Sequence, residues 1–152
     1  MQVYHLRRDD LPGVRTAAAL GTFDGVHLGH QAVLRRTVDE AQKRGVDSAA
    51  VTFDRHPAQV LRPESAPKLL TDLDETLDLI AGCGIDRTFL VEFDVAEAER
   101  DAADFTEHVL LGQVRAVALV VGQDMHFGHK RAGNIDFLTS MNADLDVVSV
   151  NP

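Results

Sequence analysis

Two histidines at the start of an expected helix are the residues best suited to chemistry. His27 and His30 stand three positions apart, and Gly29, which has no Cβ, lets a ligand approach the backbone between them. The first turn of a helix offers free N–H donors and the positive end of its dipole. Imidazoles beside it can therefore donate hydrogen bonds to phosphate oxygens. This arrangement suits nucleotidyl transfer, which positioning and electrostatic stabilisation can carry without a covalent enzyme nucleophile.

Competing interpretations of these histidines have less support. Both could be surface residues of a helix-capping loop, but they lie in G-x-F-D-G-x-H-x-G-H between a strand and a helix, which favours function. Neither G-x-G-x-x-G nor G-x-x-x-x-G-K-[ST] occurs, so dinucleotide and P-loop sites have no motif. His126 and His129 repeat the spacing, yet one cysteine, Cys83, and scattered loops do not make a zinc set. We expect no protein metal site, and favour Mg²⁺ carried in on ATP phosphates.

The elements around the histidine loop follow from periodicity and end signals. A small apolar run predicts a strand over Val14–Leu20, and apolar residues at helical spacing predict a helix over Gln31–Arg44. Gly45 is its expected C-cap, and Asp47–Phe53 is a second buried strand. Further strands are expected at 86–93, 115–121 and 145–150, and further helices at about 71–81, 101–111 and 136–141.

Strands that alternate with helices, several of them continuous apolar runs, predict an α/β fold: a parallel sheet with helices on both faces. Ligands bind such folds at the carboxyl ends of the strands. Glycine-rich loops follow Leu20 and Val121, so the two loops could share one site. The segment 54–70 contains Pro57, Pro63 and Pro67, and we expect an irregular flap there, because long loops in compact domains are commonly functional. We expect one domain over 1–152.

Composition narrows the class of protein. The chain has 152 residues and a formal net charge of -9, which argues against a nucleic-acid partner, since such proteins usually carry a basic face. No stretch approaches the roughly 20 apolar residues of a membrane helix, so no membrane partner is expected. With no signal peptide in view and a single cysteine, the cytoplasm is the expected location.

Three ordered motifs resemble one family, the adenylyltransferase module of bacterial bifunctional riboflavin kinase/FAD synthetase. They are G-T-F-D-G-V-H-L-G-H at 21–30, T-F-D-R-H-P at 52–57 with the run 62–71, and V-G-Q-D-M-H-F-G-H-K-R-A-G-N at 121–134. The resemblance covers nearly the whole chain. It implies a Rossmann-like nucleotidyltransferase fold and the conversion of ATP and FMN to FAD and pyrophosphate with Mg²⁺.

The resemblance also implies roles for individual residues. His27 and His30 would be catalytic and contact the ATP phosphates. The other residues implied at ATP are Gly21, Phe23, Asp24, Gly29 and Asp124, and those implied at the flavin are His56, Pro57, Phe105, Met125 and Phe127. Phe105 also sits on an apolar helical stripe typical of core. Phe127 lies in a loop, where an aromatic ring has less reason to be core and could stack on a flavin. Lys68, Lys130 and Arg131 could neutralise phosphate or be solvated surface, and for Lys130 we favour surface.

Two departures from the family pattern bear on activity. Met125 stands where the family usually has an aromatic residue. The family continues into a serine- and arginine-bearing motif that binds the triphosphate, and then into a riboflavin kinase domain, both beyond Pro152. Without that arginine we expect the 152-residue chain to bind ligands weakly and turn over poorly. The alternatives are a non-catalytic nucleotide- or flavin-binding domain, or another H-x-G-H nucleotidyltransferase with a different acceptor.

Overall fold

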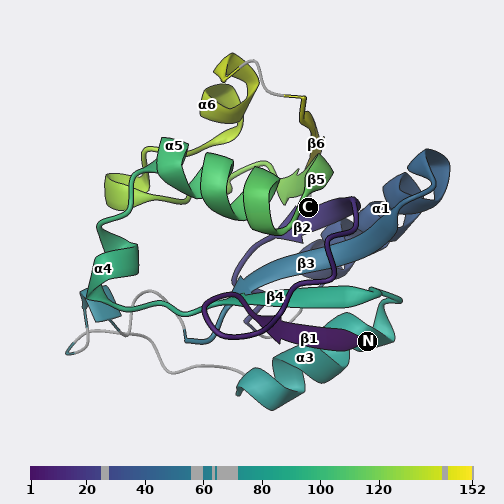
Figure 1. Ribbon diagram of the computed structural model, residues 1–152, viewed down its shortest axis with the longest axis horizontal. Helices are drawn as coiled ribbons and strands as arrows, with labels where there is room; N and C mark the ends of the chain where they lie inside the picture. Colours follow the sequence, from purple (N-terminus) through teal and green to yellow (C-terminus); the bar gives the residue numbers. More distant parts are fainter. Residues whose placement is uncertain (25–27, 56–59, 63, 65–71, 142–143, 152) are drawn as a thin grey trace.

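One parallel sheet organises the chain (Figure 1). The computed structural model describes residues 1–24, 28–55, 60–62, 64, 72–141 and 144–151. Within these residues six strands pair, all in parallel, in the order β1-β4-β3-β2-β5-β6. The strands are β1 (Gln2–His5), β2 (Thr16–Leu20), β3 (Asp47–Phe53), β4 (Arg87–Val91), β5 (Ala116–Gly122) and β6 (Asp146–Val150). The predicted α/β class with a parallel sheet is therefore confirmed.

Helices lie between the strands along the chain. They are α1 (Leu28–Arg44), α3 (Leu73–Gly82), α4 (Val95–Ala98), α5 (Ala102–Asp104) and α6 (Ile135–Ser140), with the π-helix η1 (Phe105–Gln113) and the 3-10 turn η2 (His129–Arg131). No helix in the described part of the chain is both long and apolar enough to span a bilayer.

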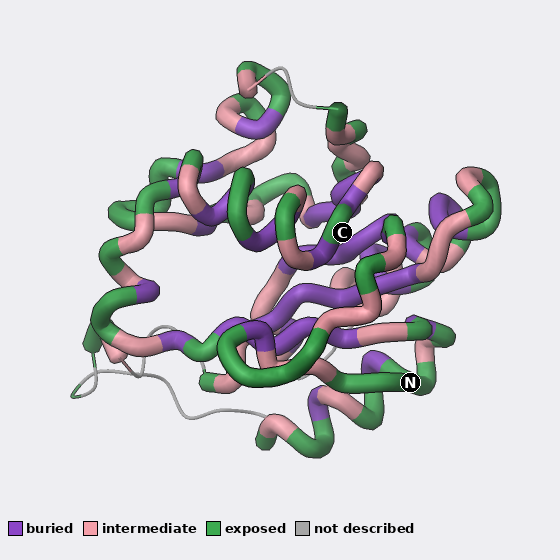
Figure 2. Tube along the Cα trace, viewed as in Figure 1, coloured by how far each residue is buried: buried purple, intermediate pink, exposed green. Residues whose placement is uncertain are grey.

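Side-chain alternation along the strands assigns the helices to the two faces of the sheet. Ala19, Ala50 and Val120 pack with Leu34 of α1 and Ile80 of α3. Their sequence neighbours point the other way, because successive strand residues face opposite sides. The opposite cluster joins Ala18, Leu20 and Val121 to η1 and α6. Figure 1 shows the α5–η1 helix in front of the sheet with α1 behind, and Figure 2 shows burial concentrated along the central strands.

The strand order reverses beside β2. The chain runs outward from β2 through β3 to β4 and then crosses back to place β5 on the other side of β2. In open α/β sheets such a reversal opens a crevice at the carboxyl ends of the two central strands. The loops after β2 and β5 lie there.

Most expected elements are present, and the differences have local causes. Gly45 has the positive φ of a C-cap, and Val46 N–H reaches Ala41 O at 3.1 Å, so the predicted end of α1 is confirmed. The helix expected at 71–81 begins after Asp72, whose carboxylate accepts the Glu75 N–H at 2.8 Å.

Three described elements were not predicted from the sequence. Strand β1 has no buried residue and shows no apolar alternation, so only its pairing with β4 identifies it. The four-residue α4 and three-residue η2 are too short for a periodic pattern. The helix expected at 101–111 continues as a π-helix, in which Val114 N–H reaches back five residues to Val109 O.

Two glycines close the loop after β5 against α5. The chain folds back so that Phe127 and Gly133 exchange two backbone hydrogen bonds of 3.0 and 2.8 Å. Gly128 has φ 78 and ψ 174, and a Cβ there would lie 2.9 Å from three atoms of Ala102. Both its backbone conformation and its contact therefore require glycine.

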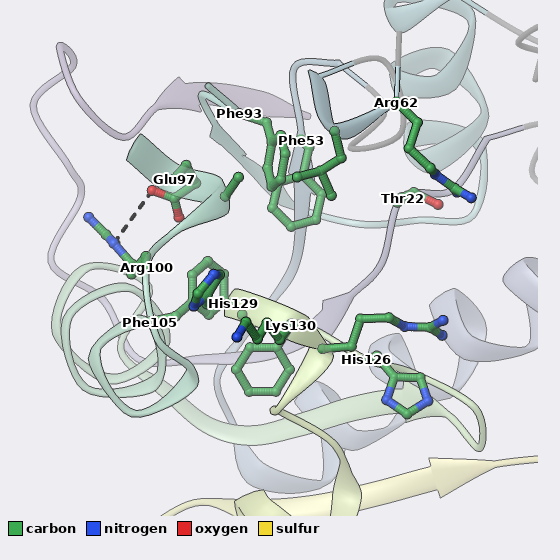
Figure 3. A pocket seen from close by; sticks show the side chains of 15 residues that line it. Thr22, Phe53, Arg62, Phe93, Glu97, Arg100, Phe105, His126, His129 and Lys130 are labelled. Atoms are coloured by element: carbon green, nitrogen blue, oxygen red, sulfur yellow. Dashed lines mark ion pairs between the residues drawn. The ribbon is translucent and has the colours of Figure 1, made fainter. Parts of the chain in front are cut away.

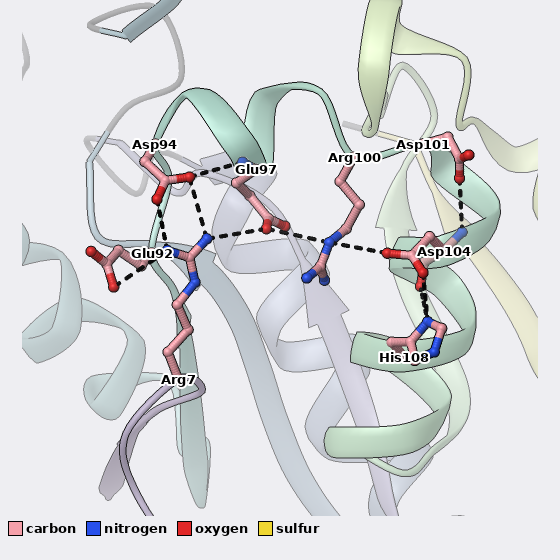
Figure 4. Close-up of polar contacts among 8 residues, drawn as sticks. All are labelled: Arg7, Glu92, Asp94, Glu97, Arg100, Asp101, Asp104 and His108. Carbon is pink, nitrogen blue, oxygen red and sulfur yellow. Dashed lines mark hydrogen bonds and ion pairs between the residues drawn. The ribbon is translucent and has the colours of Figure 1, made fainter.

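A chain of charges ties the segment after β1 to α4 and α5 (Figure 4). Arg7 donates to Asp94, the N-cap of α4, at 2.7 Å, and also approaches Glu97 Oε2 at 3.7 Å. Glu97 Oε2 lies 3.4 Å from Arg100 Nε, which lies 3.2 Å from Asp104. The side chain of Glu97 is only 4% exposed, and its Oε1 has no hydrogen-bond partner within the described residues.

Burial raises the pKa of the Glu97 carboxyl, although Arg100 and Arg7 oppose the change, and Asp94 and Asp104 add to it. The folded state therefore holds this proton more tightly than the unfolded chain does. Its contribution to stability is full below the unfolded pKa and is lost as pH rises through the folded pKa.

We predict that Glu97→Gln will change stability in a pH-dependent way. Between pH 7 and pH 4 the wild-type protein should gain free energy of unfolding relative to the variant, because only the wild type takes up the proton. Urea denaturation of both proteins across this range measures the difference in free energy of unfolding. Asp94 titrates in both proteins, so its contribution largely cancels from the difference. A difference that is flat with pH, or that grows in favour of the variant on acidification, would contradict the raised pKa.

We predict that Gly128→Ala will destabilise the fold by about 2–5 kcal/mol, from a Gly-only backbone conformation and a clash with Ala102. The matched control is Gly82→Ala at the end of α3, where a Cβ meets nothing within 4 Å and φ is not positive. That change should alter stability by less than about 1 kcal/mol. Denaturant midpoints of the two variants test the contrast, and equal effects would refute it.

Candidate active site at the carboxyl edge of the sheet

Two cavities adjoin at the carboxyl edge of the sheet. The smaller, of ≈ 340 Å³, lies between the loops after β2 and β5 and the start of α1. The larger, of ≈ 510 Å³, lies between the ends of β3 and β4, α4, η1 and the loop after β5. Thr22 and His126 line both cavities. Ligands in the two cavities would therefore meet beside these two residues.

The smaller cavity is shaped by close packing around Gly21. The Gly21 N–H donates to Val51 O at 3.2 Å, which holds the loop against β3. A Cβ on Gly21 would lie 3.1 Å from the Phe23 ring, and Phe23, at φ 52 and 1% exposure, packs edge-on against His30 at 5.6 Å. His30 lies in the first turn of α1, and the N-terminal end of a helix favours an anion through its dipole.

Phenylalanines give the larger cavity its apolar walls. Phe53 and Phe93 pack edge-to-face at 5.4 Å at the ends of β3 and β4. Asp54 joins these ends, because its carboxylate accepts the Phe93 N–H at 2.9 Å. Figure 3 shows Phe53 and Phe93 across the cavity from Phe105, His129 and Lys130. A flat aromatic ligand would have ring faces and edges to pack against here.

Basic side chains dominate the polar lining of the larger cavity. They are Arg62, Arg100, Lys130 and Arg131, with the imidazoles of His126 and His129 beside them, whereas Glu97 is the acidic residue among the described lining. Its charge is countered by Arg7 and Arg100. The local field therefore favours an anion although the chain carries a net charge of -9, because screening confines distant charges to their surroundings.

Several residues expected at ATP lie together. Gly21, Phe23, Gly29, His30 and Asp124 all line the smaller cavity. Asp24 belongs to the same loop but is not part of the described lining of either cavity. His27, His56, Pro57 and Lys68 lie outside the described residues, as does most of the expected flap.

The residues expected at the flavin line two different cavities. Phe105 and Phe127 line the larger cavity, but Met125 lines the smaller one. The Met125 N–H donates to Gly122 O at 3.1 Å, which forms a turn at the start of this loop.

The expectation that Phe127 has little reason to be a core residue was wrong. Its ring is 6% exposed and packs between Phe105 at 5.4 Å and Phe137 at 6.3 Å. The cause is the closed loop, which folds the ring over Gly133, where a Cβ would lie only 2.6 Å away. Phe105, at 3% exposure, is also core, as its apolar stripe suggested, and it contributes to the cavity wall.

Sequence reasoning missed Phe53, Phe93 and Thr22 as cavity residues. A signal for them exists, since all three stand at or just after the carboxyl ends of predicted parallel strands, where ligands bind. Nothing comparable marks Glu97 and Arg100, because they reach the cavity on the unpredicted α4 and the turn after it.

Lys130 and Arg131 have left-handed backbones, with φ of 56 and 57. For residues with a Cβ this conformation costs roughly 1–2 kcal/mol each. Such strain is common at functional sites, where surrounding structure maintains it. Both residues are exposed, as favoured for Lys130, and both also line the larger cavity.

Comparisons with known proteins agree with this architecture. The chain resembles the bifunctional riboflavin kinase/FMN adenylyltransferases of Pseudomonas fluorescens (39% identical, over 80% of this chain and 39% of that one) and Escherichia coli K12 (36%, 84% and 40%). A putative enzyme of the same name from Geobacillus thermodenitrificans is 38% identical over 84% of this chain and 68% of its own. The chain thus spans about two fifths of the length of the first two relatives.

Solved structures support the fold. A structure titled macrolide-efflux protein from Streptococcus pneumoniae matches all of this chain and 52% of its own, with a TM-score of 0.83 and 23% identity. The universal stress protein of Archaeoglobus fulgidus matches 88% of this chain and 97% of its own, at 0.51 and 18%. At these identities the likeness concerns the fold alone. The family model for FAD synthetase, in contrast, matches residues 13–152, and the chain therefore belongs to the FAD synthetase family.

Proposed function

We propose that this chain transfers the AMP group of ATP to FMN, giving FAD and pyrophosphate. The observation that carries the proposal is the pair of cavities joined at Thr22 and His126. A group-transfer enzyme must hold donor and acceptor with the reacting atoms in contact, and such positioning supplies much of the rate. Family membership and the printed names of the relatives support the same chemistry.

ATP would occupy the smaller cavity. Gly21 and Gly29 line this cavity, and the first turn of α1 with His30 would supply donors to the phosphates. We keep His27 as the second phosphate-binding histidine on the strength of the motif alone.

FMN would occupy the larger cavity, with its ring among the phenylalanines and its phosphate among the cations. One phosphate oxygen of FMN attacks the α-phosphorus of ATP, a new P–O bond forms, and the bond to the β-phosphate oxygen breaks. The electron pair leaves with pyrophosphate. Donors fixed around the phosphates stabilise the charge that develops in this step.

Mg²⁺ suits the donor set of the smaller cavity. Among the described residues no three potential ligands gather into a metal cage, but Asp124 lines this cavity. A cation held mainly by ATP phosphates and water needs only one or two such carboxylates. When bound, the metal would neutralise phosphate charge.

The names of the relatives pair this transfer with riboflavin kinase. Riboflavin kinase makes FMN, the acceptor proposed here. We therefore propose a riboflavin kinase domain as the partner of this module.

We predict that His30→Ala will lower the rate of FAD formation by about 10²-fold, the usual effect of losing one fixed donor to a developing charge. The protein is mixed with ATP, FMN and Mg²⁺, and FAD and pyrophosphate are followed by chromatography. His108→Ala is the control, since this exposed histidine lines neither cavity. Pyrophosphate release that does not depend on FMN would point to another acceptor, and an unchanged rate in His30→Ala would remove the histidine from the mechanism.

We predict that Phe53→Leu will weaken FMN binding about 5- to 10-fold and leave ATP binding unchanged, because aromatic stacking contributes about 1–3 kcal/mol per ring. Titrations of flavin fluorescence and of ATP binding separate the two effects. Phe89→Leu is the matched control, since Phe89 is a buried phenylalanine that stacks on Tyr4 and lines neither cavity. It should reduce stability and leave FMN affinity intact. Equal losses of ATP and FMN affinity in Phe53→Leu would argue against separate cavities.

A further inference from the structure

Glu97 is a buried carboxyl group at the wall of the larger cavity, and one of its oxygens lacks a partner. Its side chain is 4% exposed, and within the described residues its Oε1 meets no hydrogen-bond donor. Glu40 on α1 is similarly buried but differs, because three basic side chains approach its two oxygens at 3.4–3.5 Å. A buried acceptor without a donor costs free energy, and a ligand that supplies the donor removes this cost.

The carboxyl group of Glu97 is held in place through its other oxygen. Oε2 lies 3.4 Å from Arg100 Nε and 3.7 Å from Arg7 Nη2. Arg7 is in turn fixed by Asp94, the N-cap of α4, whose carboxylate it meets at 2.7 Å. The two arginines therefore counter the charge of Glu97 and fix its position, and they leave Oε1 to another donor.

Glu97 marks the end of the larger cavity that is remote from the reacting phosphates. Figure 3 shows Glu97 at one end of this cavity and His126 at the other. His126 also lines the smaller cavity, so donor and acceptor would meet at its end. The rings of Phe53 and Phe93 line the wall between the two ends. An acceptor whose phosphate reaches the junction and whose ring lies among the phenylalanines would therefore present the far edge of that ring to Glu97.

The two outer edges of a flavin ring differ in polarity. One edge is an imide, with one N–H donor between two carbonyl acceptors, and the other edge carries two methyl groups. A carboxylate accepts hydrogen bonds, and a protonated carboxyl group both accepts and donates them. Glu97 can therefore accept the imide N–H in either form, whereas a methyl edge would leave its Oε1 without a partner.

We propose that Glu97 accepts a hydrogen bond from the imide N–H of the acceptor's ring, so that the module selects flat rings with a free imide edge. This inference rests on the proposed function and adds a residue of α4 that determines acceptor specificity. The same contact fixes the orientation of the ring and directs the phosphate-bearing chain toward the junction of the two cavities. Glu97 takes no part in the transfer of AMP itself.

The test compares FMN with 3-methyl-FMN, in which a methyl group replaces the imide hydrogen. 5-Deaza-FMN is the ligand control, since its ring is altered away from the imide and keeps the N–H. Dissociation constants are measured by flavin fluorescence for the wild-type protein, Glu97→Gln and Glu97→Leu. Glutamine keeps an acceptor at nearly the same size, whereas leucine removes the acceptor and still fills the space. Glu99→Leu is the matched control, because this exposed glutamate at the end of α4 lines neither cavity.

We expect the wild type to bind FMN at least about tenfold more tightly than 3-methyl-FMN, the usual effect of a hydrogen bond to a charged group. Glu97→Gln should keep most of this preference. Glu97→Leu should bind FMN and 5-deaza-FMN about tenfold more weakly and 3-methyl-FMN about as well as the wild type does, so its preference disappears. In FAD formation the leucine variant should show a raised KM for FMN and an unchanged kcat, because the ring contact is the same before and during transfer. Glu99→Leu should retain the wild-type affinities.

Three results would overturn the inference. One is equal affinity of the wild type for FMN and 3-methyl-FMN, a comparison that needs no variant. A second is a preference that Glu97→Leu retains, since the methyl group would then be excluded by its bulk. A third is an equal loss of affinity for all three flavins in Glu97→Leu, which would indicate damage to the cavity. If the wild type binds ATP but none of the flavins, the proposed function fails along with the inference, whereas FAD formation without imide selectivity leaves the proposed function standing.

Discussion

The reversal of strand order between β2 and β5 is the constraint on which the rest of this structure depends. Parallel pairing aligns the carboxyl ends of all described strands at one edge. Where the strand order reverses, the loops after β2 and β5 lead away from each other and leave a crevice between them. Backbone at those ends has no further sheet to pair with. The sequence can therefore place glycines, histidines and cations there without interrupting the core, and both cavities open at this edge.

Close packing around the central strand makes this edge compact. Ala17, Ala18 and Ala19 of β2 are fully buried, and small side chains on both faces let α1 and η1 approach the sheet. Glycines allow equally close packing beyond the strand, since the Phe23 ring packs on Gly21 and the Phe127 ring packs on Gly133. Because interiors are close-packed, the aromatic rings fixed in this way define cavity walls rather than mobile covers.

The pairing of basic residues with carboxylates differs between the larger cavity and the rest of the described surface. Arg7 and Arg44 each meet a carboxylate, and Glu97 at the larger cavity is countered by Arg7 and Arg100. The cavity wall contributed by the loop after β5 keeps its cations unpaired. Over distances of about a Debye length the acidic remainder of the chain is screened, so an anionic ligand experiences the local positive charge. The net charge of the chain is therefore compatible with the proposed binding of two phosphorylated ligands.

The sequence by itself determined the features that depend on neighbours along the chain. Apolar runs identified the central strands, and helical spacing with Gly45 identified α1 and its end, although the helix begins at Leu28, three residues before the expected start, so that His30 lies in its first turn. Tertiary structure alone decided which residues share a wall. Met125 and Phe127 are two positions apart yet line different cavities, and Phe127 is buried because distant Phe105 and Phe137 enclose it. Strand β1 exists through its pairing with β4, and Glu97 reaches its partners through a helix of four residues. The physical reason is that short-range preferences set local conformation, whereas a cavity is formed by side chains from elements that only the packing of the whole sheet brings together.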